Sequence, residues 1–565
     1  MASQKVKVKK KKKKPRMLPN ILIFAPLRRS RNAADIIHRA YALYYWRLCR
    51  TKRDRLAVIK AFLLSPLQIT RDIRHWSGRL GQAAADYGKP LWRQYLEQFY
   101  LAFFFSIDLE NYYLQEFYRP DGLRRARHFV NKGAIKYGVY NILSTYGKHL
   151  HREIPTCSLG RKIEFTEYCR RNKLAVVPVL MQFMNDGRVI DFRQGSDNPG
   201  ELPEADLFCK PNVANEGEGA EIWFWKGEQG YVNSGGESLT TRKLKERLTA
   251  LARRHGSQSF LVQPLVLPHP ELMPFRKQAT PTVRIITYTD SGGEYKVDCA
   301  MLRFSRDPAS VVDNASAGGM VAPIDKTTGM MGSAVDSGLT RISRRWEQHP
   351  DNGAQIKGRL IPYWKESLEL VLRAHKLFPH RFVIGWDVLI TAGGPLLLEG
   401  NSQPGVCFIQ KAHLKPLGEM DAGATMAHYS RKALDFLYNG IIGPGDDGKK
   451  LDLFNGSSLR RQLNWLLGGR MRAIHLIISG KVQGVYYRKW LQKKARKYRL
   501  AGWVRNSFDG TVEAVLKGRA ADIEDVVRST WIGPPRARVS SVKVNWYKEP
   551  VGRGFKILAT VKSRG

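Results

Sequence analysis

A strand, a glycine-containing loop and a helix, in that order near the C-terminus, constrain the fold of this chain more than any other feature. The loop runs from Gly480 to Arg488, and the turn signal Asp509-Gly510 follows further along. Hydrophobic alternation and helical periodicity on either side predict a β-α-β-β-α-β ferredoxin-like domain over residues 470–565. The expected elements are strand 473–479, helix 489–499, a strand ending near Asn506, strand 511–515, helix 522–530, and strands near 542–547 and 555–561.

The loop between the first strand and the first helix has the chemistry of an anion site. Its backbone N–H groups would converge at the N-terminal end of a helix, where the helix dipole also favours negative charge. Arg488 adds a planar guanidinium that matches a phosphate. We therefore expect a phosphate-binding loop with Asn506 beside it. The alternative from the residues alone is an inactive ferredoxin-like module.

These residues closely resemble the acylphosphatase family, through Gly480–Arg488, Gly502–Asn506, Asp509-Gly510 and Gly533-Pro534. The resemblance implies hydrolysis of carboxyl–phosphate anhydrides, with Arg488 binding the phosphate and Asn506 orienting the attacking water. The implied reaction needs no metal, cofactor or general base, because the carboxylate is a good leaving group, so positioning and charge stabilisation suffice. The phosphate-binding residues that it implies are Gln483, Gly484, Val485, Tyr486, Tyr487 and Arg488.

Residues 151–439 have a different texture, in which short β-branched strands alternate with glycine-rich turns and occasional helices. This pattern predicts an α+β or α/β enzyme body. We expect one clear helix, over 364–377. The candidate strands are 174–180, 207–209, 222–224, 260–264, 282–287, 295–303, 382–390 and 395–399.

A hairpin in this body carries oxygen ligands. Asp387 lies on its first strand, and Glu399 and Asn401 share one face of its second strand. We predict a three-residue turn, Ala392-Gly393-Gly394, because that register places Asp387 opposite Glu399. Such a face suits Mg²⁺, although a pair of structural surface acids is the alternative.

A lysine beside a flexible loop, Lys210 with Gly217 and Gly219, is a second candidate, because such a pair can hold ATP phosphates. An ordinary hairpin loop is the alternative.

Together, Lys210 with its loop, strand 260–264, Thr282-Val283-Arg284, Gly318-Gly319 and the metal hairpin resemble the ATP-grasp superfamily, in its sugar-transfer-associated branch. The resemblance covers roughly residues 95–439. It implies ATP and Mg²⁺ as cofactors, and a ligase that activates a carboxylate as an acyl phosphate for an amine or similar nucleophile. Lys162 and Lys210 would contact phosphates, Gln263 would lie at the adenine hinge, and Arg284 would stabilise charge on the transferred phosphate. Asp387, Glu399 and Asn401 would hold the metal.

The charge of the chain is abnormal, with 93 Lys+Arg against 50 Asp+Glu and a net charge of +43. Such a surface attracts polyanions, anionic membranes or anionic substrates. Residues 1–16 hold eight lysines and are expected to be a disordered polybasic tail. Residues 17–150 read as helical, with regularly spaced aromatic residues in the helix core. A basic amphipathic face around 39–60 could instead contact a membrane surface.

The chain therefore reads as an α+β multidomain protein, with a linker and a short helix over 440–469. We expect a bifunctional enzyme, an ATP-grasp ligase joined to an acylphosphatase that can clear misreleased acyl phosphates. One alternative is a hydrolase whose ATP-grasp body only regulates it, and another is a non-enzymatic polyanion-binding protein. Six scattered cysteines, no secretory signal and no apolar run long enough to span a bilayer favour a cytoplasmic protein, or one peripheral at the inner membrane face.

Overall fold

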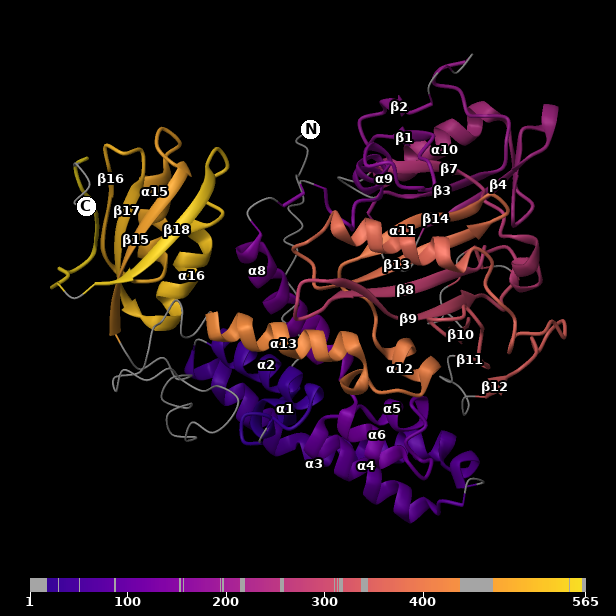
Figure 1. Ribbon diagram of the computed structural model, residues 1–565, viewed down its shortest axis with the longest axis horizontal. Coiled ribbons are helices and arrows are strands. Elements are labelled where there is room, and N and C mark those ends of the chain that lie inside the picture. Colours follow the sequence, from indigo (N-terminus) through magenta and orange to yellow (C-terminus); the bar gives the residue numbers. More distant parts are fainter. Residues whose placement is uncertain are drawn as a thin grey trace, which may run out of the picture.

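The computed structural model shows three sheets and a layer of helices (Figure 1). Residues 1–17 and 437–470, which include the expected tail and linker helix, lie outside the described residues. The structure describes residues 18–28, 30–49, 51–85, 88–151, 154–155, 157–193, 195, 198–213, 219–254, 259–308, 310–311, 313, 319–336, 344–436, 471–547 and 549–560.

The N-terminal region is helical, as expected, but not all of its aromatic residues form core. Tyr112, Tyr113 and Phe117 are buried together, whereas Tyr95 and Tyr100 on α4 are exposed. The alternative of an amphipathic surface around 39–60 stays a prediction: α2 is largely buried apart from its last residue Leu48, and the other exposed apolar residues of this range lie on α3. The elements are α1 (Pro19–Phe24), α2 (Ala33–Leu48), α3 (Lys52–Ala85), α4 (Leu91–Phe105), α5 (Leu109–Leu114), α6 (Gly122–His128), α7 (Lys132–Ala134), the π-helical turn η1 (Ile135–Val139) and α8 (Tyr140–Leu150).

The first sheet of the body has seven antiparallel strands in the order β2-β1-β7-β3-β4-β5-β6. Helix α10 covers it, and Leu244 and Leu248 of that helix pack with strand residues such as Trp223 and Val262. The elements are α9 (Lys162–Arg171), β1 (Met181–Phe183), β2 (Val189–Asp191), β3 (Leu207–Pro211), β4 (Glu221–Trp225), η2 (Gly227–Gln229), β5 (Tyr231–Asn233), β6 (Ser238–Leu239), α10 (Thr241–Arg254) and β7 (Phe260–Pro264).

The second sheet, also of seven antiparallel strands, has the order β12-β11-β10-β9-β8-β13-β14. Helices cover both of its faces in Figure 1, with α11 on one side and α12 and α13 on the other. The elements are η3 (Pro270–Phe275), β8 (Thr282–Thr289), β9 (Tyr295–Phe304), β10 (Met320–Ile324), β11 (Ala334–Asp336), β12 (Arg345–Trp346), α11 (Trp364–Lys376), β13 (Val383–Thr391), β14 (Gly394–Asn401), α12 (Cys407–His413), η5 (Leu417–Glu419) and α13 (Asp421–Asp435).

Side-chain alternation along the central strands fixes which residues can reach the site. On β13, Ile384, Trp386 and Val388 pack beneath α11 in one hydrophobic cluster. Successive side chains of a strand point to opposite faces, so Asp387 points away from α11. Arg284 is the pairing partner of Asp387 on β8 and shares that face.

The expected strand over 174–180 is wrong. Val176 forms only an isolated parallel bridge to Leu397, and β1 begins later, at Met181. Pro178 explains the interruption, because proline has no N–H to donate to a sheet. The other strands and the helix expected in the body are confirmed to within a few residues at each end.

The C-terminal domain has the predicted β-α-β-β-α-β order, followed by one short extra strand. Its five-stranded sheet has the order β18-β15-β17-β16-β19, in which only the β16–β19 pairing is parallel. Both helices contribute apolar side chains to its core, including Leu491 and Val527. The elements are β15 (Met471–Lys481), α15 (Tyr487–Lys497), β16 (Ala501–Asn506), β17 (Val512–Arg519), α16 (Ala520–Thr530), β18 (Arg538–Trp546) and β19 (Phe555–Ile557).

Candidate active sites

The β13–β14 hairpin places Asp387 directly opposite Glu399, as the sequence predicts, but by a different route. The turn has two residues rather than three, because Thr391 pairs with Gly394. A β-bulge at Leu398 then inserts one unpaired residue, so that Val388 pairs with Leu397 and Asp387 with Glu399. The predicted register is therefore confirmed, and the predicted three-residue turn is wrong.

Asp387 is a buried carboxylate held by two arginines. The Nη2 atom of Arg284 donates to Asp387 Oδ2 at 2.8 Å, and its Nε donates to Oδ1. Arg303 Nη2 donates to the same Oδ2 at 3.2 Å. Burial alone would raise the pKa of Asp387, but the two guanidinium groups overcome it and hold that pKa below its usual range. The side chain is therefore ionised at neutral pH despite its burial.

A second buried acid completes this group. Arg303 Nη2 donates to Asp313 Oδ1 at 3.2 Å, and the Thr282 hydroxyl donates to the other oxygen of the same carboxylate. Burial raises the pKa of Asp313, while the Arg303 charge opposes that shift. Sequence reasoning missed both Arg303 and Asp313. Thr282 pairs with Arg303 across β8 and β9, and no local motif signals that juxtaposition.

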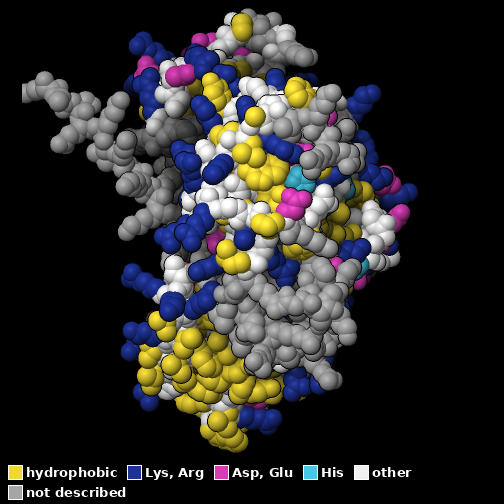
Figure 2. Space-filling model, turned by 90° about the vertical axis from the view of Figure 1, so that its left-hand side faces the viewer, with side chains coloured by type: hydrophobic (Ala, Val, Ile, Leu, Met, Phe, Trp, Pro, Cys, Tyr) yellow, Lys and Arg dark blue, Asp and Glu magenta, His cyan; other side chains and the backbone are white. Residues whose placement is uncertain are grey.

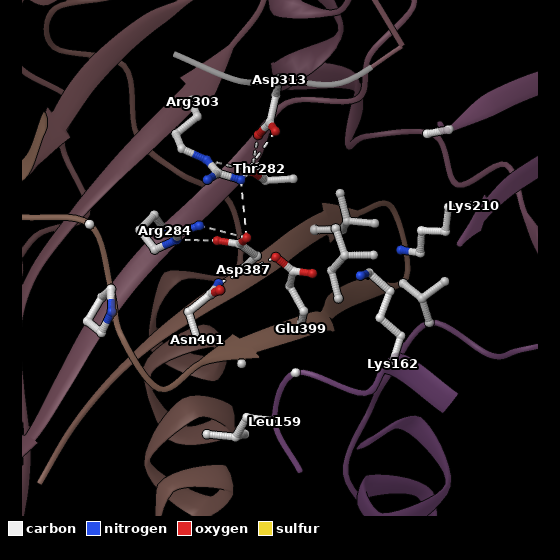
Figure 3. A pocket seen from close by; sticks show the side chains of 18 of the residues that line it. Leu159, Lys162, Lys210, Thr282, Arg284, Arg303, Asp313, Asp387, Glu399 and Asn401 are labelled. Atoms are coloured by element: carbon white, nitrogen blue, oxygen red, sulfur yellow. Dashed lines mark hydrogen bonds and ion pairs between the residues drawn. The ribbon is translucent and has the colours of Figure 1, made fainter. Parts of the chain in front are cut away.

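Glu399 and Asn401 extend the acidic face toward the cavity in Figure 3, which also labels Asp387 beside them. Asn401 Nδ2 lies 3.4 Å from Glu399 Oε1. The donor set of two carboxylates and one amide oxygen suits the hard, oxygen-preferring Mg²⁺ ion. Within the described ranges no three His, Cys, Asp or Glu side chains form a metal cluster. Asp387, Glu399 and Asn401 are thus residues that fit Mg²⁺, and their role as ligands stays a prediction.

Two lysines face the acidic group from the opposite wall of the cavity. Lys162 begins α9 and Lys210 lies on β3, and in Figure 3 both side chains point toward Glu399. Burial lowers the pKa of Lys210 to about 8; nearby Lys162 adds to that effect, and the Glu399 carboxylate opposes it. A partly desolvated lysine pair of this kind is suited to bind phosphate oxygens.

The remaining predicted nucleotide contacts differ in how well they are placed. Gln263 on β7 lines the same cavity; its Nε2 donates to the carbonyl oxygens of Val177 and Pro178, while its buried Oε1 has no partner among the described residues. Gly219 is described and adopts positive φ, whereas Gly217 lies outside the described residues. The role of Gln263 at an adenine hinge stays a prediction.

All of these side chains line one cavity of about 750 Å³ between the two sheets of the body. Its walls also include residues from the N-terminal helical region. Lys132, Lys136 and Tyr140 contribute to the lining, and the Tyr140 hydroxyl donates to the carbonyl of Pro404 at 2.7 Å. The volume lies within the usual range for a small-molecule or cofactor site.

The C-terminal domain holds a separate candidate site at the N-terminal end of α15. Gly484 has φ of +71° and Tyr486 has φ of +61°, so the backbone turns sharply before the helix begins. No side chain caps this helix. Among the described residues, none of the N–H groups from Gln483 to Arg488 donates to a backbone or side-chain acceptor. The loop therefore presents unpaired donors in front of a helix dipole, as an anion site requires.

Arg488 is the second residue of α15 and Asn506 is the last residue of β16, and their action at this loop stays a prediction. In the described part of the chain, neither side chain takes part in a hydrogen bond or ion pair, and both are half-buried. Gln483 holds the two parts of the site together, because its Nε2 donates to the carbonyls of Ser507 at 2.7 Å and Thr511 at 2.8 Å. Its side chain thus supports the Asn506 strand end, so only its backbone remains for an anion.

Comparison with known proteins matches two segments of this chain to known families. A family model described as sugar-transfer associated ATP-grasp matches residues 144–419, and an acylphosphatase model matches residues 474–557. The acylphosphatase of Acidiphilium cryptum (strain JF-5) is 46% identical over 90 residues, which are 16% of this chain and 99% of that protein. The acylphosphatase of Pelotomaculum thermopropionicum is 48% identical over 90 residues, which cover 16% and 96% of the two chains. A solved acylphosphatase from Coxiella burnetii is 37% identical and covers 16% of this chain and 95% of its own, with a TM-score of 0.16.

Proposed function

Because this chain belongs to the acylphosphatase family through its C-terminal domain and carries a sugar-transfer associated ATP-grasp domain, we propose that it both makes and hydrolyses acyl phosphates. The observation that carries the hydrolase half is the unpaired loop with Arg488 and Asn506 beside it. These two side chains make no hydrogen bond or ion pair among the described residues, so a ligand-binding role accounts for them best.

In the proposed hydrolysis, the loop N–H groups and Arg488 bind the phosphate of an acyl phosphate. Asn506 orients a water molecule whose oxygen attacks the phosphorus atom. The bond between phosphorus and the acyl oxygen breaks, and the carboxylate leaves with the bonding electron pair. Fixed donors around the phosphate oxygens stabilise the charge that gathers there, and no resident metal is needed.

For the body, we propose that ATP and Mg²⁺ bind in the cavity between the two sheets and that a carboxylate is activated there. Lys162 and Lys210 would contact phosphates, while Asp387, Glu399 and Asn401 would hold the metal. The metal would neutralise charge on the nucleotide phosphates. Arg284, held by Asp387, would keep a fixed positive charge near the transferred phosphate.

The hydrolase proposal is tested with a generic acyl phosphate such as benzoyl phosphate. The full chain, and a segment of residues 470–565, should release phosphate from it in the presence of EDTA. The segment should fold alone, because the relatives it resembles are no longer than about 90 residues at nearly full coverage. If EDTA abolishes the activity, the proposed metal-free mechanism is wrong.

The ligase proposal is tested by following ADP formation against pools of carboxylates and amines. A Glu399→Gln variant tests the metal site, because it removes the negative charge of one proposed metal ligand and keeps the shape of the side chain. ADP formation that equals the parent rate in this variant would contradict the proposed metal site.

We further propose that the hydrolase clears acyl phosphate that the body releases without transferring it. An Arg488→Ala variant should then release less inorganic phosphate than the parent when ATP and the carboxylate are supplied without an acceptor, while ADP formation persists. Unchanged phosphate release in this variant would contradict the coupling but leave each separate activity intact.

A further inference from the structure

The N-terminal half of α4 reverses the pattern of a helix on the surface of an ordinary soluble domain, whereas the C-terminal half also buries the apolar residues Leu101 and Ala102. Its buried face carries Gln94 and Gln98, which are both 0% exposed, and the carboxylate of Glu97. Its outer face carries Trp92, which is 65% exposed, and Leu96, which is 63% exposed. A surface helix normally turns its apolar stripe toward the core and its polar residues toward water. The reversed pattern indicates that water is not the intended environment of this face.

The buried polar residues of α4 are hydrogen-bonded in the interior, although Gln98 Oε1 has no partner among the described residues. Glu97 Oε2 accepts from Lys89 Nζ at 2.7 Å and from the Tyr112 hydroxyl at 2.8 Å. Gln98 Nε2 donates to Ser77 Oγ at 3.0 Å and to the Tyr113 hydroxyl at 3.2 Å. Because this network fixes the rotation of α4 in the bundle, the outward direction of the apolar side chains is built into the fold.

The neighbouring helix α3 exposes a second apolar stripe. Its inner face packs Val58, Ile69 and Ile73 into the bundle. On its outer face, Leu63 is 68% exposed and Leu67 is 72% exposed. When a helix is apolar on its outer side as well as its inner side, the outer side is expected to bind a partner. The outward apolar residues of α3 and α4, called the apolar face below, are Leu56, Ile59, Leu63, Leu64, Leu67, Leu91, Trp92, Tyr95, Leu96, Tyr100 and Phe104.

Figure 2 shows a broad hydrophobic area at the lower end of the molecule, where α1, α3 and α4 lie in Figure 1, with Lys and Arg side chains around it. Between residues 52 and 105 there are nine Lys+Arg and four Asp+Glu, and the buried ion pair of Lys89 with Glu97 accounts for one of each. The eight lysines of residues 5–14 shortly precede Leu18 in the sequence, and α1 begins directly after Leu18. Helix α1 packs against both α3 and α4. Positive charge is thus carried by the same helices as the apolar face and by the sequence that precedes α1.

We propose that the apolar face docks onto the surface of an anionic lipid bilayer. Leucine side chains would enter the acyl boundary, Trp92 and the two exposed tyrosines would lie at headgroup level, and the surrounding lysines and arginines would contact lipid phosphates. No helix among the described residues is long and apolar enough to cross a membrane, so these helices lie along the surface. We choose a bilayer over a protein partner because the positive charge around the apolar face complements the phosphates of anionic lipids.

The test measures flotation of the full chain with vesicles of phosphatidylcholine and phosphatidylglycerol in a 3:1 ratio, and with phosphatidylcholine alone. The parent should bind the anionic vesicles more tightly. A Leu63→Gln/Leu67→Gln variant should bind them at least about tenfold more weakly, because two leucine side chains no longer enter the bilayer. An Ile532→Gln/Leu360→Gln variant, which changes two exposed apolar residues elsewhere, should bind like the parent.

A second measurement places the face in the bilayer without relying on the stability of the double variant. Acyl-chain-brominated lipids should quench part of the tryptophan emission of the parent, and Trp92→Phe should remove the quenched part while binding persists. The proposal is overturned if the parent does not bind anionic vesicles, or if the two double variants bind equally. It is also overturned if the parent is an oligomer that Leu63→Gln/Leu67→Gln dissociates, because the face would then join copies of the chain.

Discussion

Arg488 and Asn506 offer the sharpest test of the hydrolase, because neither side chain makes a hydrogen bond or ion pair among the described residues. Replacing a half-buried side chain that has no partner usually changes stability by less than about 0.5 kcal/mol. Arg488→Gln and Asn506→Ala should therefore inactivate with heat at the same temperature as the parent hydrolase. Any loss of rate can then be assigned to chemistry rather than to unfolding.

The two variants should nevertheless lose different kinetic quantities. Arg488 bonds a charged phosphate, and a hydrogen bond to a charged group contributes about 1.5–3 kcal/mol, so Arg488→Gln should weaken phosphate inhibition by about 10- to 150-fold. Its kcat should also fall by about 10²–10³-fold, the usual cost of removing one donor to transition-state charge. Asn506→Ala should lose a similar factor in kcat, but phosphate should still inhibit it within about threefold of the parent.

The assay is hydrolysis of benzoyl phosphate by the full chain, with inorganic phosphate as a competitive inhibitor. Asn506→Asp keeps the size of the side chain and serves as a control for packing. Equal loss of phosphate affinity in the Arg488 and Asn506 variants would refute the separate roles. If the variants inactivate at a lower temperature than the parent as well as losing kcat, the side chains also stabilise the fold, and the separation of chemistry from stability is refuted.

Three further outcomes are expected. Gln483→Met should lower the thermal stability of the hydrolase domain by about 0.5–1.5 kcal/mol and its kcat as well, because it removes the hydrogen bonds from Nε2 to the carbonyls of Ser507 and Thr511, each of which keeps one backbone N–H donor; unchanged inactivation by heat would contradict this. Nucleotide affinity should weaken as pH rises through about 8, because Lys210 loses its charge there. ATP binding at pH 8 should therefore take up about half a proton, which calorimetry in two buffers measures. Lys210→Arg should flatten this pH dependence. Asp387→Asn should destabilise the body by about 3–5 kcal/mol, because it leaves the buried guanidinium of Arg284 without a carboxylate partner, although Arg303 keeps Asp313, whereas Glu399→Gln should mainly impair nucleotide turnover; equal melting temperatures for the two variants would count against this.

The C-terminal domain was the part most readable from the sequence, because its signals are local. A glycine loop, a turn dipeptide and alternating apolar residues each act over a few positions, and together they determine the order of the strands and helices. The position of Asn506 at the end of β16 followed from the same signals. The supporting role of the Gln483 side chain did not follow, because its acceptors lie more than twenty residues away.

Elsewhere the sequence identified residues but not their surroundings. Helical spacing correctly placed Tyr95 and Tyr100 on a helix, yet periodicity cannot say which side of a helix faces the interior. The hydrogen bonds of Gln94 and Gln98 to other helices determine which side of α4 faces the interior. Likewise, Asp387 and Glu399 were readable as a pair, but Arg303 reached them only through the pairing of β8 with β9.

Because of the bulge at Leu398, the pairing of Asp387 with Glu399 does not depend on the number of residues in the hairpin turn alone. In an uninterrupted hairpin, adding or removing one turn residue would reverse the direction of every side chain beyond it. Here the extra residue lies next to Glu399, so the pairing of Asp387 with Glu399 is set beside the site and not at the tip. Ala392 and Gly393 are exposed at that tip and carry none of the residues of the cavity. Insertions and deletions can therefore accumulate there during evolution, and the tip is a natural place to attach a label or a tag.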